Sequence, residues 1–193
     1  MTTLVLAHGA GAGQAHPWMR HVAAGFDARG LRVVTFDFPY IAQGRKLPDK
    51  SPVLEAAFVK VWEEAARAAD GPLLAAGKSM GGRIASMVAA RQGFAPVPAG
   101  LIFFGYPLHP PGKPEQRRDR HLPDIKVPTL FIHGTKDPFG TPDEMTGLVA
   151  GLPGATLHLV DKGDHSLIAK RGQPVPDDLL DRVRDWTAPI LPQ

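Results

Sequence analysis

Short apolar segments typical of β-strands alternate with segments of helical periodicity along the whole chain. Residues 4–7, Leu-Val-Leu-Ala, contain no polar side chain, so a strand formed there would be buried on both faces. A strand–helix–strand pattern that repeats in this way predicts an α/β fold, in which helices cover both faces of a mostly parallel sheet. The six expected strands are residues 4–7, 31–36, 72–76, 101–104, 129–132 and 156–160.

Four helices are expected where apolar residues recur at every third or fourth position. The first follows Pro17 and ends at Gly30, and the second begins at Ser51, its expected N-cap, and ends at residues 70–71. The other two span residues 81–92 and 177–186. Because a domain usually has roughly 100–200 residues, the chain, residues 1–193, is expected to form a single domain.

The composition excludes several classes of protein. The chain has no cysteine, which excludes a disulfide framework, a thiolate zinc site, an iron–sulfur cluster and a cysteine nucleophile. Its formal net charge of +3 is too small to indicate a nucleic-acid partner. No apolar run approaches the roughly 18–20 residues of a membrane-spanning helix, and no signal peptide is evident. We therefore expect a cytoplasmic protein without a membrane partner.

Residues 77–81, Gly-Lys-Ser-Met-Gly, form a G-x-S-x-G motif between an expected strand and an expected helix. In this context the motif predicts a sharp turn that raises the hydroxyl of Ser79 above the edge of the sheet. The small residues two positions before and after Ser79 let neighbouring backbone approach the turn. The N-terminus of the following helix directs positive potential at the same point. We therefore predict that Ser79 is a nucleophile.

A serine nucleophile needs a base, and the base needs a carboxylate that orients it. Asp137 follows the fifth expected strand and His165 follows the sixth, so the chain order is Ser, Asp, His, as in α/β-hydrolase triads. We predict His165 as the general base and then acid, and Asp137 as its orienting group. Alternatives remain open: His133 as the base, and Asp164 or Asp161 as the orienting carboxylate.

Stabilisation of an oxyanion requires N–H donors that are already in position. One is expected to be the backbone N–H of Met80, the residue after the nucleophile. The other is expected in the turn after the first strand, at Ala10, with Gly11 as the next candidate. His8, which begins that turn, is expected to be structural.

Two nucleotide-binding motifs nearly match but fail at a required glycine. A phosphate-binding loop ending at residues 77–79 would need glycine at position 72, which is Pro72. A dinucleotide fingerprint beginning at Gly9 or Gly11 would need glycine at position 14 or 16, which are Gln14 and His16. The eight histidines form no metal-binding motif. No cofactor and no metal are therefore expected.

Five motifs resemble those of one superfamily: His-Gly-Ala-Gly-Ala-Gly at residues 8–13, Gly-Lys-Ser-Met-Gly-Gly-Arg at 77–83, Phe-Gly-Tyr-Pro-Leu-His-Pro-Pro-Gly-Lys-Pro at 104–114, His-Gly-Thr-Lys-Asp at 133–137 and Gly-Asp-His at 163–165. Together they resemble the α/β-hydrolase superfamily, and within it a small dienelactone-hydrolase-like branch. The second and third motifs resemble a subfamily that includes a testis-expressed hydrolase-like protein and a scaffold subunit of a chromatin acetyltransferase complex.

This resemblance implies a serine hydrolase that cleaves a carboxylic ester or thioester of a small molecule through an acyl-enzyme. It also implies an alternative, a hydrolase-fold protein-interaction module with little or no catalysis. The chain lacks the helical cap of larger relatives between residues 104 and 129, where residues 106–124 form a Pro-rich loop that is either a lid or a partner surface. Serine replaces the cysteine of dienelactone hydrolase proper, so that substrate is not carried over. The sequence predicts no particular oligomeric state.

Aromatic residues near the carboxyl ends of the expected strands are the candidate walls of a substrate pocket. They are Phe38, Tyr40, Tyr106 and Phe139. The missing cap predicts an open, shallow cleft that prefers short acyl groups. Lys78 and the basic cluster at residues 117–120 raise the possibility of anionic esters.

Overall fold

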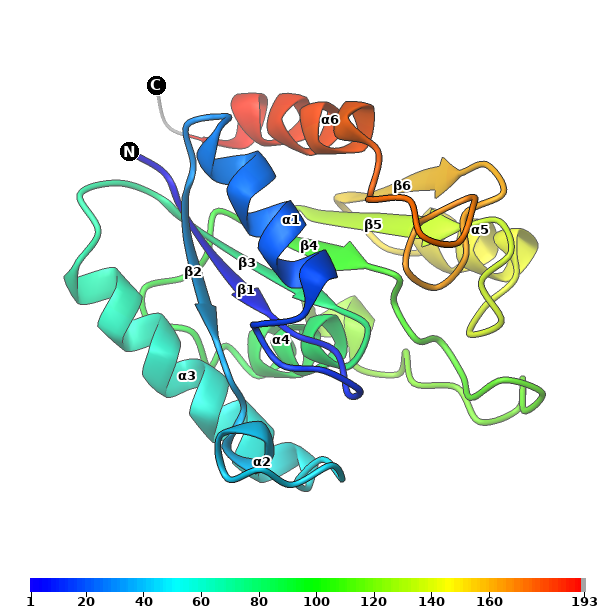
Figure 1. Ribbon diagram of the computed structural model, residues 1–193, viewed down its shortest axis with the longest axis horizontal. Helices are drawn as coiled ribbons and strands as arrows, with labels where there is room; N and C mark the ends of the chain where they lie inside the picture. The colour runs from blue at the N-terminus through cyan, green and yellow to red at the C-terminus, as the bar shows by residue number, and fades with distance from the viewer. Residues whose placement is uncertain (192–193) are drawn as a thin grey trace.

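In the described part of the chain, residues 1–191, six strands form one sheet through the centre of the molecule (Figure 1). The structure is a computed structural model. The strands lie in the order β2-β1-β3-β4-β5-β6, and every neighbouring pair is parallel. Their bounds are β1 (Thr3–Ala7), β2 (Arg32–Phe36), β3 (Leu73–Lys78), β4 (Gly100–Phe104), β5 (Thr129–Gly134) and β6 (Ala155–Val160).

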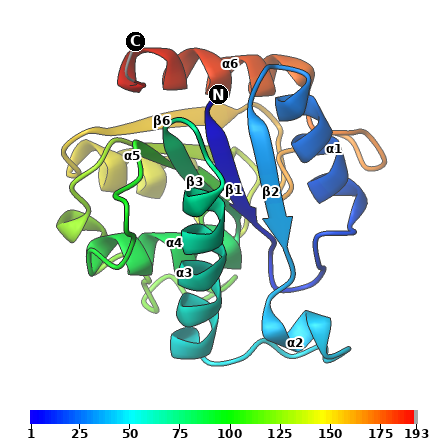
Figure 2. The ribbon, with the colours of Figure 1, turned by 90° about the vertical axis from the view of Figure 1, so that its left-hand side faces the viewer.

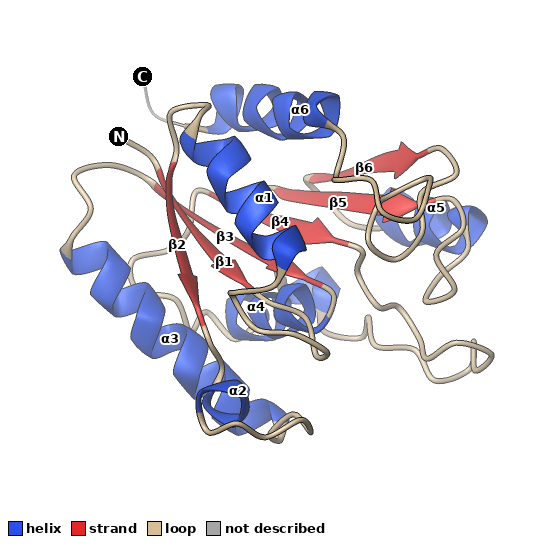
Figure 3. Cartoon of the chain, in the orientation of Figure 1, coloured by secondary structure: helices blue, strands red, loops and turns tan. Residues whose placement is uncertain are grey.

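Helices cover both faces of this sheet, as the view turned by 90° shows (Figure 2), and the colouring by secondary structure separates the sheet from the helices (Figure 3). α1 and α6 pack against one face, and α3, α4 and α5 pack against the other. The bounds are α1 (Pro17–Asp27), α2 (Pro39–Ala42), α3 (Ser51–Arg67), α4 (Met80–Ala90), α5 (Pro142–Ala150) and α6 (Asp177–Thr187), with 3-10 turns η1 (Leu122–Asp124) and η2 (Ala188–Ile190).

The central strands β1 and β4 are almost wholly apolar and fully buried because successive side chains enter opposite cores. In β1, Val5 and Ala7 belong to the core under α3 and α4, whereas Leu4 and Leu6 belong to the core under α1 and α6. All four side chains are fully buried. The fully apolar run in the sequence is therefore explained by a central strand with two buried faces.

The expected architecture is confirmed, with two corrections of detail, at the start of α3 and at α2 and α5. All strand pairs are parallel, in agreement with the mostly parallel sheet expected from the sequence. Ser51 is the first helical residue of α3 rather than its cap, because Lys50 occupies the N-cap position with no side-chain hydrogen bond. The helices α2 and α5 were not expected. Between β4 and β5 the described chain contains no helix other than η1.

The strand order places two loops side by side that are far apart in the sequence. β1 pairs with β2 on one side and with β3 on the other, so the order in which strands join the sheet switches sides at β1. In parallel sheets a ligand site is expected at such a switch point, beyond the carboxyl ends of the strands. The loop after β1 and the turn after β3 therefore meet at one edge of the sheet. Among the described helices none is long and apolar enough to cross a membrane.

Candidate active site

Ser79 lies on a strained turn between β3 and α4. Its backbone has φ 50° and ψ −116°, a left-handed conformation that non-glycine residues rarely adopt. The flanking glycines permit this turn: a Cβ on Gly81 would lie 2.6 Å from the carbonyl oxygens of Ala7 and His8, and one on Gly77 would clash with the backbone of Gly81 and Gly82. Both glycines of the motif are therefore required by backbone packing.

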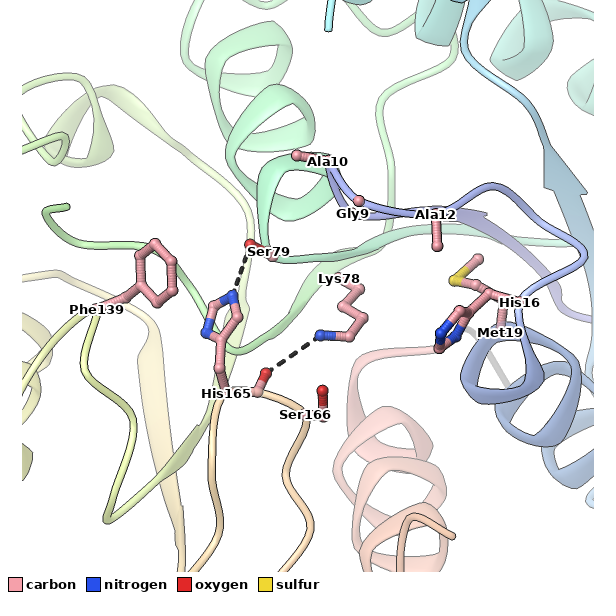
Figure 4. Close-up of a pocket in the computed structure, with 11 residues that line it drawn as sticks. Gly9, Ala10, Ala12, His16, Met19, Lys78, Ser79, Phe139, His165 and Ser166 are labelled. Atoms are coloured by element: carbon pink, nitrogen blue, oxygen red, sulfur yellow. Dashed lines mark hydrogen bonds between the residues drawn. The ribbon is translucent and has the colours of Figure 1, made fainter. Parts of the chain in front are cut away.

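Three side chains from three different loops form a continuous hydrogen-bonded series, of which Figure 4 shows the bond between Ser79 and His165. The Nε2 atom of His165 lies 2.7 Å from Oγ of Ser79, and its Nδ1 atom lies 2.7 Å from Oδ2 of Asp137. A neutral imidazole that donates from Nδ1 to Asp137 has a lone pair on Nε2 that can accept the hydroxyl proton. The arrangement has the geometry that activation of a serine hydroxyl requires.

Asp137 is held by its surroundings in the orientation that faces His165. Its side chain is fully buried, and its second oxygen, Oδ1, accepts a 2.9 Å hydrogen bond from the backbone N–H of Phe139. The ring of Phe139 in turn stacks on the imidazole of His165, with centroids 4.1 Å apart. The carboxylate and the aromatic ring together restrict the orientation of the imidazole.

The alternative residues take other roles in the structure. His133 is buried and bonds through Nε2 to the carbonyl oxygen of Gly140, 2.8 Å away. Asp164 accepts hydrogen bonds from the backbone N–H groups of Ser166 and Ile168 in its own loop. The side chain of Asp161 is 85% exposed. None of the three is bonded to Ser79 or His165 among the described residues.

The loop after β1 lies directly against the turn that carries Ser79. A Cβ on Gly9 would be 3.6 Å from Cβ of Ser79, and both Gly9 and Ala10 line the same cavity as Ser79. Within residues 1–191, no acceptor is bonded to the backbone N–H of Met80 or of Ala10. The two expected oxyanion donors are therefore brought to the site with free hydrogens.

His8 and Tyr40 fix the conformation of this loop. His8 donates from Nδ1 to the carbonyl oxygen of Gly9 at 2.7 Å and accepts at Nε2 from the backbone N–H of Phe38 at 3.0 Å. Because the carbonyl of Gly9 and the N–H of Ala10 belong to one trans peptide, holding the carbonyl also fixes the direction of the N–H. Tyr40 donates its hydroxyl to the carbonyl oxygen of Ala10 at 2.9 Å.

The electrostatics of the loop match these bonds. Burial lowers the pKa of His8, so the ring favours the neutral form that can accept from Phe38. Burial likewise raises the pKa of Tyr40 to about 12, which keeps its hydroxyl a donor. The loop is thus held by neutral groups whose protonation states are fixed by burial.

A cavity of about 340 Å³ opens beside Ser79 and His165. This volume is at the lower end of the range for small-molecule sites, roughly 300–1,000 Å³. The structure contains no cluster of three or more potential metal-ligating side chains among residues 1–191. The lining residues are Gly9, Ala10, Gly11, Ala12, His16, Met19, Lys78, Ser79, Phe139, His165 and Ser166.

A family model for the alpha/beta hydrolase domain matches residues 1–187, nearly the whole chain. The chain belongs to this α/β-hydrolase family. The α/β-hydrolase fold expected from the sequence is therefore confirmed.

Solved structures of similar fold agree with this assignment. Dienelactone hydrolase from Anabaena variabilis has a TM-score of 0.76 at 19% sequence identity, over 98% of this chain and 87% of that chain. Est1E from Butyrivibrio proteoclasticus, solved with ferulic acid, has a TM-score of 0.74 at 13% identity, over 97% of this chain and 88% of that chain. A thermophilic esterase from Thermogutta terrifontis, solved with malate, has a TM-score of 0.72 at 15% identity, over 98% and 90%.

In this α/β-hydrolase, only one of the four expected pocket aromatics lines the cavity. Phe139 does so, whereas Phe38 is buried in the core under α3. Tyr40 is buried beneath the loop after β1, and Tyr106 is buried with its hydroxyl donating to the carbonyl oxygen of Arg118 at 2.8 Å. Nearness to a strand end positions the Cα atom, but packing decides where the side chain points.

Four side chains that line the cavity of the α/β-hydrolase were not expected there: Ala12, His16, Met19 and Ser166. His16 is the N-cap of α1, and its ring accepts a hydrogen bond from the backbone N–H of Trp18. Met19 belongs to the buried face of α1. The available signal was their position, since all four follow the first or the sixth strand at the carboxyl edge of the sheet.

Proposed function

We propose that this α/β-hydrolase is a serine hydrolase that cleaves a carboxylic ester or thioester of a small molecule through an acyl-enzyme. The observation that carries the proposal is the hydrogen-bonded series from Ser79 through His165 to Asp137, with both bonds at 2.7 Å. Esterases among the structures of similar fold support the choice of ester chemistry, although at this identity they establish the fold alone.

The acylation step uses four groups. Oγ of Ser79 attacks the carbonyl carbon while Nε2 of His165 takes the hydroxyl proton. The N–H groups of Met80 and Ala10 stabilise the oxyanion of the tetrahedral intermediate, each by about 3 kcal/mol. When the intermediate collapses, the bond to the alcohol or thiol breaks, and His165 gives its proton to that leaving group.

Deacylation reverses the roles of attacking and leaving group. Water attacks the acyl carbon of the ester on Ser79, and Nε2 of His165 takes a proton from it. The acyl–Oγ bond then breaks, His165 returns the proton to Oγ, and the carboxylic acid leaves. Asp137 stays ionised throughout and stabilises the imidazolium that forms in each half-reaction.

Labelling with a fluorophosphonate tests the proposal, because such a probe forms a stable bond only with an activated serine. We expect one adduct per chain, located on Ser79 by mass spectrometry of the digested protein. The variant Ser79→Ala should lose the label, and Ser51→Ala, a control at the start of α3, should keep it. Folded protein that takes no label at neutral pH would overturn the proposal.

The alternative, a protein-interaction module that uses residues 106–124, receives less support. Tyr106 and Leu108 at one end of this segment and Leu122 at the other are buried, and no residue of the segment lines the cavity. The exposed residues of the segment are 111–117, 120, 123 and 124. Capture of a protein partner that is unaffected by Ser79→Ala, together with absence of the label, would favour this alternative.

We also propose the finer placement of the chain in the dienelactone-hydrolase-like branch, near the testis-expressed and chromatin-scaffold subfamily. This placement is supported by the motifs at residues 77–83 and 104–114. This placement implies no particular substrate.

A further inference from the structure

Lys78 places a positively charged group inside the candidate active-site cavity. It immediately precedes Ser79, is partly buried, and lines the cavity. Its Nζ atom donates a 3.2 Å hydrogen bond to the backbone carbonyl oxygen of His165 and lies 5.3 Å from the centre of the Trp18 ring. An ammonium group has three N–H donors, so this single carbonyl leaves donor capacity unused.

The cavity contains no negative charge that would neutralise Lys78. Among the described residues that line it, none is Asp or Glu, and Lys78 forms no ion pair within residues 1–191. Burial lowers the pKa of Lys78, although Asp137 and Asp164 attract its charge from a distance. A poorly hydrated ammonium in such a place gains more from an anionic ligand than an exposed one does.

The position of Lys78 relates this charge to the reacting atoms. In Figure 4 its side chain lies between the Ser79–His165 pair on one side and His16 and Met19 on the other. His16 caps the N-terminus of α1, which adds positive potential from the helix dipole at this wall. A substrate that extends from Ser79 towards α1 must pass beside the ammonium group.

We propose that Lys78 binds a carboxylate of the substrate, so that the ester or thioester is one derived from a carboxylate-bearing acid, such as the half-ester of a dicarboxylic acid. This inference rests on the proposed function and names the substrate class of that site. Of the basic residues considered, only Lys78 is placed to bind this carboxylate. Arg117, Arg118 and Arg120 do not line the cavity, and Arg117 is paired with Asp119.

Two esters of equal length test the inference: mono-4-nitrophenyl adipate, which ends in a carboxylate, and 4-nitrophenyl hexanoate, which ends in a methyl group. We expect kcat/KM of the natural enzyme to favour the adipate about tenfold at low salt, and the preference to shrink as ionic strength rises. In Lys78→Met the ratio of the two kcat/KM values should fall by about tenfold or more. Lys78→Arg, which keeps the charge, should restore part of it.

The ratio separates substrate recognition from a purely structural role. The bond from Lys78 to the His165 carbonyl is lost in Lys78→Met, so both rates fall, but a structural anchor would lower them equally. Equal losses on the two esters, or a natural enzyme without preference for the adipate, would overturn the inference. Turnover of the hexanoate and labelling of Ser79 would still support the proposed function.

A binding measurement gives a second readout that needs no turnover. Calorimetric titration of Ser79→Ala with monoethyl adipate, against neutral diethyl adipate, should show at least about tenfold tighter binding of the anion. The double variant Ser79→Ala/Lys78→Met, checked for folding by circular dichroism, should lose that difference. Equal binding of the two compounds to Ser79→Ala would contradict the inference even if no ester is turned over.

Discussion

Asp137 is the residue at which a minimal change has the largest expected effect on activity. In Asp137→Asn the side-chain amide would face Nδ1 of His165 with a donor, which favours the tautomer that carries its proton on Nε2. That tautomer cannot accept the proton of Ser79, so kcat should fall by about 10,000-fold. Ester hydrolysis by purified protein measures the effect.

A neighbouring carboxylate supplies the matched control. Asp164 lies next to His165 in sequence but bonds only to the backbone of its own loop among the described residues. Asp164→Asn should therefore retain far more activity than Asp137→Asn. A larger loss from the Asp164 variant would assign the orienting role to that residue instead.

His8 is expected to be a positioning residue for the oxyanion donor. His8→Leu removes the closer of two donors to the carbonyl oxygen of Gly9 and leaves only the Tyr40 hydroxyl at 3.4 Å, which loosens the peptide that carries the N–H of Ala10. A misplacement of this kind lowers kcat by about 100-fold. In His8→Asn, the side-chain amide occupies about the position of Nδ1 and can still donate to Gly9.

The comparison of these two variants isolates the positioning role. Both leave the N–H of Phe38 without its acceptor, so both should lose a similar part of the folding free energy, about 1–3 kcal/mol. Only His8→Leu should show the large fall in kcat, with KM little changed. Equal kcat values in the two variants would remove the positioning role and leave His8 a purely structural residue.

For single residues, the sequence predicted the place of a residue in the fold better than the direction of its side chain. Ser79, Asp137 and His165 are predicted to meet because each follows a strand and the carboxyl ends of parallel strands share one edge of a sheet, and the structure brings their side chains into contact. The same argument selected Phe38 and Tyr40 as pocket walls, yet both side chains point into protein. Side-chain direction depends on packing partners distant in sequence, which no local pattern reveals.

Among the elements, the junction of β3 and α4 has little tolerance for added atoms. Gly81 lies in the first turn of α4, and an alanine there would bring Cβ to 2.6 Å from two backbone carbonyl oxygens of the β1 end. Because neither backbone can move without distorting the sheet, Gly81→Ala should lower the free energy of unfolding by about 2–3 kcal/mol. Urea denaturation measures the change.

At a second helical glycine, substitution by alanine is expected to raise stability rather than lower it. Gly147 lies in α5, is exposed, and has no atom within 4 Å of the position of an added Cβ. Gly147→Ala should therefore raise stability by up to about 1 kcal/mol through helix propensity alone. Similar effects at Gly81 and Gly147 would contradict the close backbone approach in the structure.

The sequence predicted long helices with a clear apolar stripe but not α5, which has only two buried side chains, Met145 and Val149. A local signal was present, since Thr141 and Glu144 form a capping box with Pro142 at the first helical position. At the start of α3, by contrast, a local signal was followed and gave the wrong position. Ser51 is a residue type favoured at N-caps, but its backbone is already helical.

For the molecule as a whole, the alternation of strands and helices predicted layers but not strand order. The order β2-β1-β3-β4-β5-β6 depends on where each crossover returns to the sheet, which is decided by packing of whole elements. That order brings the loop after β1 beside Ser79, so the placement of the proposed oxyanion donors depends on the topology. The resemblance to a known superfamily supplied what periodicity alone did not.

The absence of a cap in the described chain bears on the size of the acyl group. Between β4 and β5 no helix other than η1 lies over the cavity, so little apolar surface is available to bury a long acyl chain. Across a series of 4-nitrophenyl esters, kcat/KM should be highest for short acyl groups and fall for chains beyond about eight carbons. Each buried CH₂ group contributes about 0.8 kcal/mol, and the CH₂ groups of a long chain would find no protein surface that buries them. Activity restricted to long chains would contradict this prediction.

The folded molecule is also expected to lose stability in mild acid because two histidines are buried. The side chains of His8 and His133 are fully buried, and burial lowers the pKa of both rings below 6.5. Below pH 6.5 the unfolded chain therefore binds protons that the native state resists, so stability falls as pH decreases through this window. His109 acts in the opposite direction: burial lowers its pKa, but the carbonyl of Pro110 and the carboxylate of Glu144 raise it by more.

Urea denaturation at pH 7.5, 6.5 and 5.5 tests this expectation. The two buried rings should lower the free energy of unfolding at pH 5.5, each by no more than about 1.4 kcal/mol per pH unit below 6.5. Glu144 does not act in this window, since its pKa is lowered to about 2, first by the backbone N–H of Thr141, and its contribution persists above pH 4.5. His133→Gln, which cannot titrate, should flatten the pH dependence, whereas an unchanged slope would show that protonation of His133 does not limit stability in acid.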